Sequence, residues 1–235
     1  MLSLSGVVLG SDCAEANAAE VQQQAVFSAI TDGLRQKDYC VLPNALPLPL
    51  AQALWHYVQT LPAPKFMAAG VGRQSDFSQN QFVRRDEICW IDGSSPAGRD
   101  WLDWAGALQR QINRELFMGL FSFESHFAHY APGAFYKKHV DAFKGQANRV
   151  VSLVVYLNPV WLPDDGGELA IYADDTGPES QAVPVLKVMP NFATVVAFLS
   201  EQVPHEVLPA QRDRYSIAGW FRVNTSTANR VDPPK

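Results

Sequence analysis

The sequence predicts an α+β protein, in which a β-sandwich or jelly roll carries helices on one of its sheets. Two observations lead to this class. The first half of the chain places apolar residues at helical spacing in three segments. From Phe121 onward the pattern changes to short alternating strands separated by turn residues. The 235 residues are 47% hydrophobic and 18% charged, which is the composition of an ordinary globular domain.

Three helices are expected within residues 17–120, which we interpret as helical support. The first lies in 18–35, the second has Pro49 in its first turn, and the third begins with Asp100 as its cap. The apolar residues that define them are Val26, Phe27, Ile30, Leu34, Leu50, Leu54, Tyr57, Val58, Leu102, Ala105, Leu108, Ile112 and Leu116. Short strands are expected at 39–42 and 88–91.

Between these two strands lies a different kind of segment. Residues 68–85 are rich in Gly, Ser, Gln and Asn. We expect a long loop or an exposed hairpin, and long loops in compact domains are often functional.

The second half of the chain is expected to form the strand core, residues 121–223. Strands are predicted at 121–130, 134–140, 149–157, 168–172, 183–188, 194–199 and 214–223. Turn residues such as Ala131-Pro132-Gly133 and Asp164-Asp165-Gly166-Gly167 separate them. The chain contains no repeat and no Gly/Ser linker. We therefore expect a single domain over 1–235, with a loose tail at 1–16 and a C-terminal tail at 224–235.

Charge and cysteine content exclude some classes of protein. A net charge of −5 argues against a nucleic-acid partner, which needs clustered Lys and Arg. No apolar run approaches the roughly 18 residues of a membrane span. The segment before Arg35 has no basic residue and so does not resemble a signal peptide. Three cysteines without a CxxC motif suit a reducing compartment, and we expect a cytoplasmic protein.

The residues that carry chemistry begin with His139-Val140-Asp141, at the end of a predicted strand. Residues i and i+2 of a strand point to the same face, so an imidazole and a carboxylate project together. Alone, this pattern is equally consistent with a surface pair. His205 follows the apolar strand 195–199 and a turn. Two His and one Asp form the ligand set that is typical of non-haem Fe(II) with open coordination positions.

A second feature follows His205. Arg214 begins the strand 214–220, and it shares a face with Ser216, Ala218 and Trp220. The small residues leave room beside its guanidinium, which can hold a carboxylate by two hydrogen bonds. The alternative is a salt bridge to a carboxylate of the protein itself. A dicarboxylate cosubstrate would equally supply the anion.

Several motifs together resemble a known family. They are Arg85-Asp86-Glu87-Ile88-Cys89-Trp90-Ile91-Asp92-Gly93, Tyr130-Ala131-Pro132-Gly133, Tyr136-Lys137-Lys138-His139-Val140-Asp141, Tyr156-Leu157-Asn158, Gly166-Gly167-Glu168-Leu169, His205-Glu206-Val207 and Arg214-Tyr215. The sequence resembles the 2-oxoglutarate- and Fe(II)-dependent prolyl 4-hydroxylase superfamily. It most resembles the hypoxia-inducible-factor prolyl hydroxylases and their bacterial relatives. The fold that this resemblance implies is a double-stranded β-helix (jelly roll, cupin-like).

The resemblance also implies roles for individual residues. Fe(II) would be bound by His139, Asp141 and His205. Arg214, Tyr156 and Tyr130 would bind 2-oxoglutarate. Substrate contacts would come from Arg149, Trp220, Asp86 and Tyr136, with Asp86 helping to order the loop 68–85. For the tyrosines and tryptophans, Trp90 included, plain core packing is the alternative.

The activity implied is hydroxylation of a prolyl residue in a protein at C4. Fe(II), 2-oxoglutarate and O2 would be required, ascorbate would serve as a reductant, and succinate and CO2 would be coproducts. Elongation factor Tu is the leading candidate substrate, since bacterial relatives act on it. Two alternatives stay open: an oxygenase of the same fold acting on a small molecule or another side chain, and a non-enzymatic module that binds metal or 2-oxoglutarate.

Overall fold

The structure of the chain is a computed structural model that describes residues 9–70, 82–142, 148–173 and 183–224, with side chains from residue 17 onward. In chain order its elements are α1 (Leu9–Lys37), β1 (Tyr39–Leu42), α2 (Leu48–Thr60), η1 (Ala63–Lys65), β2 (Met67–Ala68), β3 (Glu87–Trp90), α3 (Pro96–Leu116), β4 (Leu120–Tyr130), β5 (Tyr136–His139), β6 (Arg149–Tyr156), η3 (Pro163–Asp165), β7 (Leu169–Ile171), β8 (Leu186–Val188), β9 (Val195–Leu199), β10 (His205–Val207) and β11 (Arg214–Val223).

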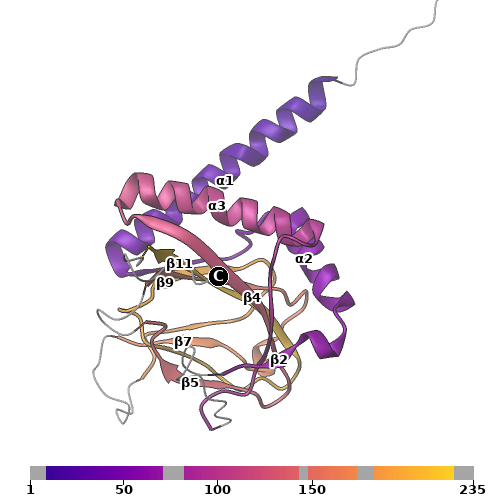
Figure 1. Cartoon of the computed structure of the whole chain (residues 1–235), viewed down its shortest axis with the longest axis vertical. Helices are drawn as coiled ribbons and strands as arrows, with labels where there is room; N and C mark the ends of the chain where they lie inside the picture. Colours follow the sequence, from indigo (N-terminus) through magenta and orange to yellow (C-terminus); the bar gives the residue numbers. More distant parts are fainter. Residues whose placement is uncertain (1–8, 71–81, 143–147, 174–182, 225–235) are drawn as a thin grey trace, which may run out of the picture.

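The strands form two antiparallel sheets that face each other, with α1, α2 and α3 on the outer side of the larger one (Figure 1). The larger sheet has the order β1-β9-β6-β11-β4-β3-β2, and the smaller has the order β5-β10-β7-β8. This arrangement confirms the predicted α+β class and the double-stranded β-helix. Because β1, β2 and β3 come from residues 39–90, the N-terminal region supplies strands to the larger sheet as well as helices.

Two apolar cores lie on opposite faces of the larger sheet. The outer core joins the helices to the sheet and includes Trp101, Leu108 and Ile112, all completely buried. The inner core lies between the sheets and includes Phe198 and Ile171. Burying a large apolar side chain stabilises the folded state by roughly 1.5–3 kcal/mol. The central strands of the larger sheet therefore have two apolar faces, and side-chain alternation directs one set of their residues toward the gap between the sheets.

The first helix differs from the prediction at its start. It begins at Leu9, so residues 9–16 are helical where a loose tail was expected. Only its C-terminal half packs on the body, through Phe27, Ile30 and Leu34, and the N-terminal half projects beyond α3 (Figure 1). The helix ends before Asp38, whose φ of 64° is left-handed and stops helical hydrogen bonding.

The third helix begins four residues before the predicted cap, because Ser95 and not Asp100 caps it. The Ser95 hydroxyl accepts a hydrogen bond from the Gly98 amide at 3.0 Å, and Pro96 occupies the first turn. The helix ends at Phe117, which is left-handed at φ 54°. Asn113 then binds both backbone groups of Leu120. These bonds fix the turn that leads into β4.

Most predicted strands are present, although several are shorter than expected. The predicted strand 183–188 is reduced to β8, and 134–140 is reduced to β5. The predicted loop 68–85 lies mainly outside the described residues. Its far end, however, is tied to the smaller sheet, since Arg84 forms an isolated β-bridge with Tyr136. Among the described helices, none combines the length and apolar character that a membrane span requires.

Candidate active site

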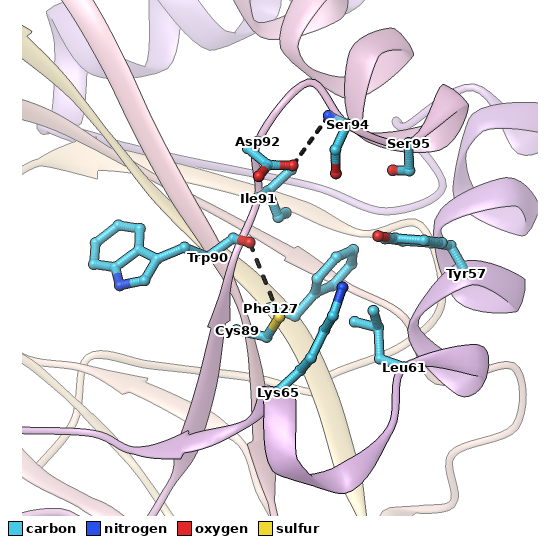
Figure 2. A pocket seen from close by; sticks show the side chains of 10 residues that line it. All are labelled: Tyr57, Leu61, Lys65, Cys89, Trp90, Ile91, Asp92, Ser94, Ser95 and Phe127. Atoms are coloured by element: carbon cyan, nitrogen blue, oxygen red, sulfur yellow. Dashed lines mark hydrogen bonds between the residues drawn. The ribbon is translucent and has the colours of Figure 1, made fainter.

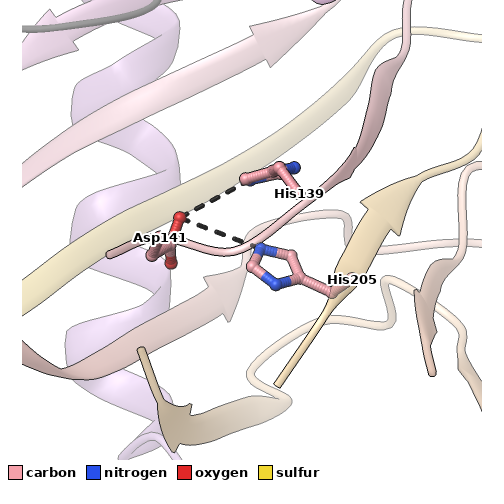
Figure 3. Close-up of side chains that lie close together, drawn as sticks. All are labelled: His139, Asp141 and His205. Atoms are coloured by element: carbon pink, nitrogen blue, oxygen red, sulfur yellow. Dashed lines mark ion pairs between the residues drawn. The ribbon is translucent and has the colours of Figure 1, made fainter. Parts of the chain in front are cut away.

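His139, Asp141 and His205 come together at one end of the smaller sheet (Figure 3). His139 on β5 and His205 on β10 are directly opposite each other in the strand register. Asp141 Oδ1 lies 3.5 Å from His139 Nε2 and 3.9 Å from His205 Nε2. One ligand atom from each of the three residues lies within 4.8 Å of the other two. The described residues contain no other group of three or more His, Cys, Asp or Glu with this geometry.

Backbone carbonyls orient both imidazoles. His139 Nδ1 lies 2.7 Å from the Lys137 carbonyl, and His205 Nδ1 lies 3.0 Å from the Val203 carbonyl. A carbonyl oxygen can only accept, so each Nδ1 carries the proton, and each Nε2 keeps a free lone pair for a metal. Burial, together with neighbouring His139, lowers the pKa of His205 to about 4. The ring is therefore neutral, as a metal ligand must be, at neutral pH.

Asp141 is held by hydrogen bonds with Ser152 of β6 and with Ser200, which follows β9, and not by its own strand. It lies two residues beyond the end of β5, so strand alternation does not set its direction as predicted. Its amide donates to the Ser200 carbonyl at 3.1 Å, and the Ser152 hydroxyl donates to Oδ2 at 2.6 Å. Burial alone would raise the pKa of Asp141, but His205, His139 and the Ser152 hydroxyl hold that pKa well below its usual range. The carboxylate is therefore ionised and available to a cation.

Arg214 is a buried cation on the larger sheet. It is 1% exposed, and no carboxylate of the described residues lies within ion-pair distance of it. Nε donates to the Gly167 carbonyl at 2.8 Å, and Nη1 reaches the Ser216 hydroxyl at 3.3 Å. Gly167 has φ +71°, and a Cβ there would lie 3.2 Å from Arg214 Cδ, so glycine makes room for the side chain. A buried charge without a protein partner is costly, which favours an anionic ligand here.

Two tyrosines flank the Arg214 guanidinium. Its Cζ lies 5.0 Å from the ring centroids of both Tyr130 and Tyr156. Tyr156 is completely buried, and its hydroxyl has no hydrogen-bond partner among the described residues. Burial raises the pKa of Tyr156 to about 12 and that of Tyr130 well above its usual value, so both are neutral donors. Both tyrosines are part of the inner core, and their rings also lie beside the buried guanidinium.

One of the predicted substrate residues, Tyr136, contacts the metal group directly. Tyr136 stacks on His139 with ring centroids 3.6 Å apart. On the same tyrosine lies the guanidinium of Arg84, 4.3 Å from the ring centroid, and Arg84 binds Asp86 through two hydrogen bonds of 2.7 and 2.6 Å. Asp86 is 2% exposed. Asp86 thus holds the guanidinium of Arg84 over the Tyr136 ring.

Trp220 and Arg149 also lie on the inner face of the larger sheet, as predicted. Trp220 pairs in register with Ser152, the residue that binds Asp141. Arg149 lies over the Trp220 ring, its Cζ 3.6 Å from the centroid. The predicted site residues thus fall into a metal group, a buried cation with two tyrosines, and the side chains that contact Tyr136 and Trp220.

The chain matches the family model described as the 2OG-Fe(II) oxygenase superfamily over residues 125–222. A solved prolyl-4-hydroxylase from Pseudomonas putida is 38% identical to it, with a TM-score of 0.73, covering 84% of this chain and 98% of that protein. The chain belongs to the prolyl hydroxylase branch of the 2OG-Fe(II) oxygenases.

The chain is also similar to animal members of this branch. A prolyl hydroxylase from Trichoplax adhaerens, solved with a hypoxia-inducible-factor peptide fragment, is 25% identical at a TM-score of 0.68, covering 87% of this chain and 92% of that one. Human Egl nine homolog 1 is 30% identical over 161 residues, which is 64% of this chain but 35% of the human protein. The chain thus spans about a third of the length of its human relative.

The residues present fit the cofactors of the 2OG-Fe(II) oxygenases. Two imidazole Nε2 atoms and one carboxylate oxygen form the two-histidine, one-carboxylate set that suits Fe(II) and leaves positions open. His139, Asp141 and His205 would hold the metal. The unpaired Arg214 guanidinium and the orphaned Tyr156 hydroxyl are suited to one carboxylate of 2-oxoglutarate.

A second cavity of about 190 Å³ lies on the outer face of the larger sheet and is separate from this oxygenase site (Figure 2). Its lining residues are Tyr57, Leu61, Lys65, Cys89, Trp90, Ile91, Asp92, Ser94, Ser95 and Phe127. The Trp90 ring points away from the other lining side chains, and it meets His126 edge-on with centroids 5.2 Å apart. Trp90 is 48% exposed, so it is not a core residue.

Sequence reasoning did not identify three residues that shape this oxygenase site. Ser152 binds Asp141, Arg84 binds Asp86, and Glu124 binds Arg149. Ser152 shares its strand face with Tyr156, and Arg84 shares the parity of Asp86, so alternation could have found both. Glu124 lies 25 residues from Arg149 in sequence, and nothing local links them.

Proposed function

We propose that this protein is a 2-oxoglutarate- and Fe(II)-dependent dioxygenase that hydroxylates a prolyl residue of a polypeptide at C4. One observation carries the proposal: a complete His-Asp-His group lies across the sheet interior from a buried arginine that has no carboxylate partner among the described residues. A metal site alone would fit many proteins. A metal site combined with an unpaired buried cation fits a reaction that uses both a metal and an anionic cosubstrate.

The protein residues contribute binding, orientation and protection from water. His139, Asp141 and His205 hold the metal, with ring orientation set by the carbonyls of Lys137 and Val203. Arg214 and Tyr156 bind the far carboxylate of 2-oxoglutarate. When bound, Fe(II) and 2-oxoglutarate supply the O2 activation that hydroxylates an unactivated C–H bond, with succinate and CO2 as coproducts. The buried apolar side chains between the sheets keep bulk water from this region.

A polypeptide is the substrate that we favour. The resemblance to prolyl hydroxylases, including a relative solved with a peptide fragment, supports this class. So do the aromatic rings of Tyr136 and Trp220, which are suited to contacting a pyrrolidine ring. Elongation factor Tu stays the leading candidate, and a cytoplasmic location is consistent with the two free thiols of Cys40 and Cys89.

The test is an aerobic incubation with Fe(II), 2-oxoglutarate and ascorbate. Separate reactions contain elongation factor Tu, proline-containing peptides, or free proline. Peptide mass spectrometry reads the addition of one oxygen, amino-acid analysis identifies 4-hydroxyproline, and succinate is quantified. We expect Arg214→Met to abolish turnover. The matched control is Arg212→Met, two residues away and half-exposed, which is expected to retain it.

The other outcomes separate the remaining functions. Turnover of free proline or another small molecule, without modification of any polypeptide, would replace the proposal with a small-molecule oxygenase. Binding of metal and 2-oxoglutarate without succinate formation in any reaction would indicate a non-enzymatic binding module. Succinate formation that requires both His139 and Arg214 rules out the module.

A further inference from the structure

Three charged side chains surround Trp220 in an arrangement that neither the motifs nor the metal site explains. Arg149, on β6, donates from both Nε and Nη2 to Glu124 Oε1, at 3.1 and 2.8 Å. Arg222, on β11, donates from Nη1 to the other carboxylate oxygen of Glu124 at 3.3 Å. A single carboxylate on β4 thus links two guanidinium groups from β11, its neighbour in the larger sheet, and from β6, the next strand beyond β11.

Contacts on two sides fix the guanidinium of Arg149. Its Cζ lies over the Trp220 ring, 3.6 Å from the centroid, and its Nε and Nη2 bind Glu124. Its third nitrogen, Nη1, makes no hydrogen bond to any described residue. The Arg149 side chain is 20% exposed, whereas the Arg222 side chain is 6% exposed. The surface of this cluster therefore presents one oriented, unused N–H donor edge.

The position of the cluster and the charge of Arg149 indicate what this edge binds. Trp220 lies beside Ser152 on the adjacent strand, and Ser152 binds the predicted metal ligand Asp141. The donor edge therefore borders the region that a substrate must enter. The guanidinium of Arg149 favours an oxygen acceptor, and it binds a carboxylate more strongly than a neutral carbonyl.

We propose that Glu124, itself held by Arg222, is a positioning residue that keeps Arg149 over the Trp220 ring, so that Arg149, the substrate contact that the family resemblance implies, presents Nη1 to an oxygen acceptor of the substrate polypeptide near the target proline. The substrate half of this statement rests on the function proposed above. The positioning half concerns only residues of this chain. A flexible Arg149 would lose side-chain freedom on binding, and prior fixation by Glu124 removes that cost.

The positioning half is tested without any substrate. The protein is labelled with 5-fluorotryptophan, and the Trp220 resonance is assigned in the ¹⁹F NMR spectrum by Trp220→Phe. Glu124→Gln is expected to shift or broaden this resonance, because Arg149 no longer stays on the ring. Glu87→Gln makes the same substitution on β3, at a side chain that is 56% exposed, and is expected to leave the resonance unchanged. An unchanged Trp220 resonance in Glu124→Gln overturns the positioning role.

The substrate half is tested by steady-state kinetics on a hydroxylated peptide. Glu124→Gln is expected to raise the KM for peptide about tenfold or more, which is the effect of losing one charge-assisted hydrogen bond, with the kcat and the KM for 2-oxoglutarate nearly unchanged. In an Arg149→Lys background the same change is expected to add little, because Glu124 acts through Arg149. Additive effects, or a raised KM for 2-oxoglutarate, would indicate general damage and overturn the inference.

Paired peptides identify the acceptor. A preference for Asp over Asn beside the proline that disappears in Arg149→Lys supports a carboxylate. Equal KM values for the two peptides, both raised in Arg149→Lys, support a backbone carbonyl. If the wild-type protein hydroxylates no polypeptide at all, the proposed function fails, and the ¹⁹F spectrum still decides the positioning role.

Discussion

Replacing Arg214 by Met should remove the response of the protein to 2-oxoglutarate while leaving its fold in place. The side chain is 1% exposed and has no carboxylate partner among the described residues, so Met fills similar space without a buried charge. Removing the buried charge stabilises the folded state, and losing the hydrogen bond to the Gly167 carbonyl opposes that stabilisation. Without 2-oxoglutarate we therefore expect the variant to unfold within a few degrees of the wild type.

The magnitude follows from the hydrogen bonds that a guanidinium makes to a carboxylate. A charge-assisted hydrogen bond contributes about 1.5–3 kcal/mol, so two of them make a loss of about 3 kcal/mol a lower estimate, or at least a hundredfold in Kd. At a concentration of 100 times the wild-type Kd, 2-oxoglutarate stabilises the wild type by about 2.7 kcal/mol. The same concentration stabilises the variant by about 0.4 kcal/mol.

The assay is thermal unfolding with Mn(II), with and without 2-oxoglutarate. For a chain of this length 1 kcal/mol corresponds to about 2–4 °C, so we expect a rise in Tm of about 5–10 °C for the wild type and about 1 °C for Arg214→Met. Arg214→Lys should fall between them, because lysine keeps the charge but not the bidentate geometry. An Arg214→Met variant that keeps the full wild-type rise would refute the assignment of Arg214 as the anchor.

Three further predictions follow from local geometry. Ser95→Ala should lower the unfolding free energy by about 1 kcal/mol by removing a helix cap, read from the Tm. Gly167→Ala should destabilise more than Gly119→Ala, since both have positive φ but only Gly167 lacks space for a Cβ; equal losses in denaturant titrations would contradict this. Burial lowers the pKa of His126 to about 4, so the unfolded state binds more protons and stability falls as the pH drops from about 6.5 to 4. In urea titrations, lowering the pH from 7 to 5 should reduce the unfolding free energy of His126→Gln by about 2 kcal/mol less than it reduces that of the wild type.

A helix or strand could be predicted from the sequence where residues close together in the chain determine its bounds. The strand containing Arg214 and Trp220 was predicted with its bounds, because alternation over ten residues is a strong signal. The start of the third helix was misplaced because Ser95 and Asp100 are both good caps, and Pro96 in the first turn was the signal that separated them. The additional turns at the start of the first helix contain too few large apolar residues to show a periodic face.

The candidate site likewise combines residues that the sequence predicts with contacts that it does not. The metal residues could be predicted from their residue types and the family motifs around them. The fact that both Nδ1 atoms face carbonyls could not, since it depends on the path of the backbone after folding. The contacts of Arg149 could not be predicted from the sequence either. Glu124 and Arg222 are 98 residues apart and meet only because β4 and β11 are neighbours in the sheet.

The two ends of the candidate cosubstrate would be held by different sheets. His139 and His205 belong to the smaller sheet, whereas Arg214 and Tyr156 belong to the larger one. The spacing of the sheets is set by the apolar residues packed between them, Phe198 and Ile171 among them. The distance between the two sheets would then determine which length of keto acid the site accepts. Enlarging or truncating Phe198 should change the preference among keto acids of different length, although this residue contributes no polar group to either end.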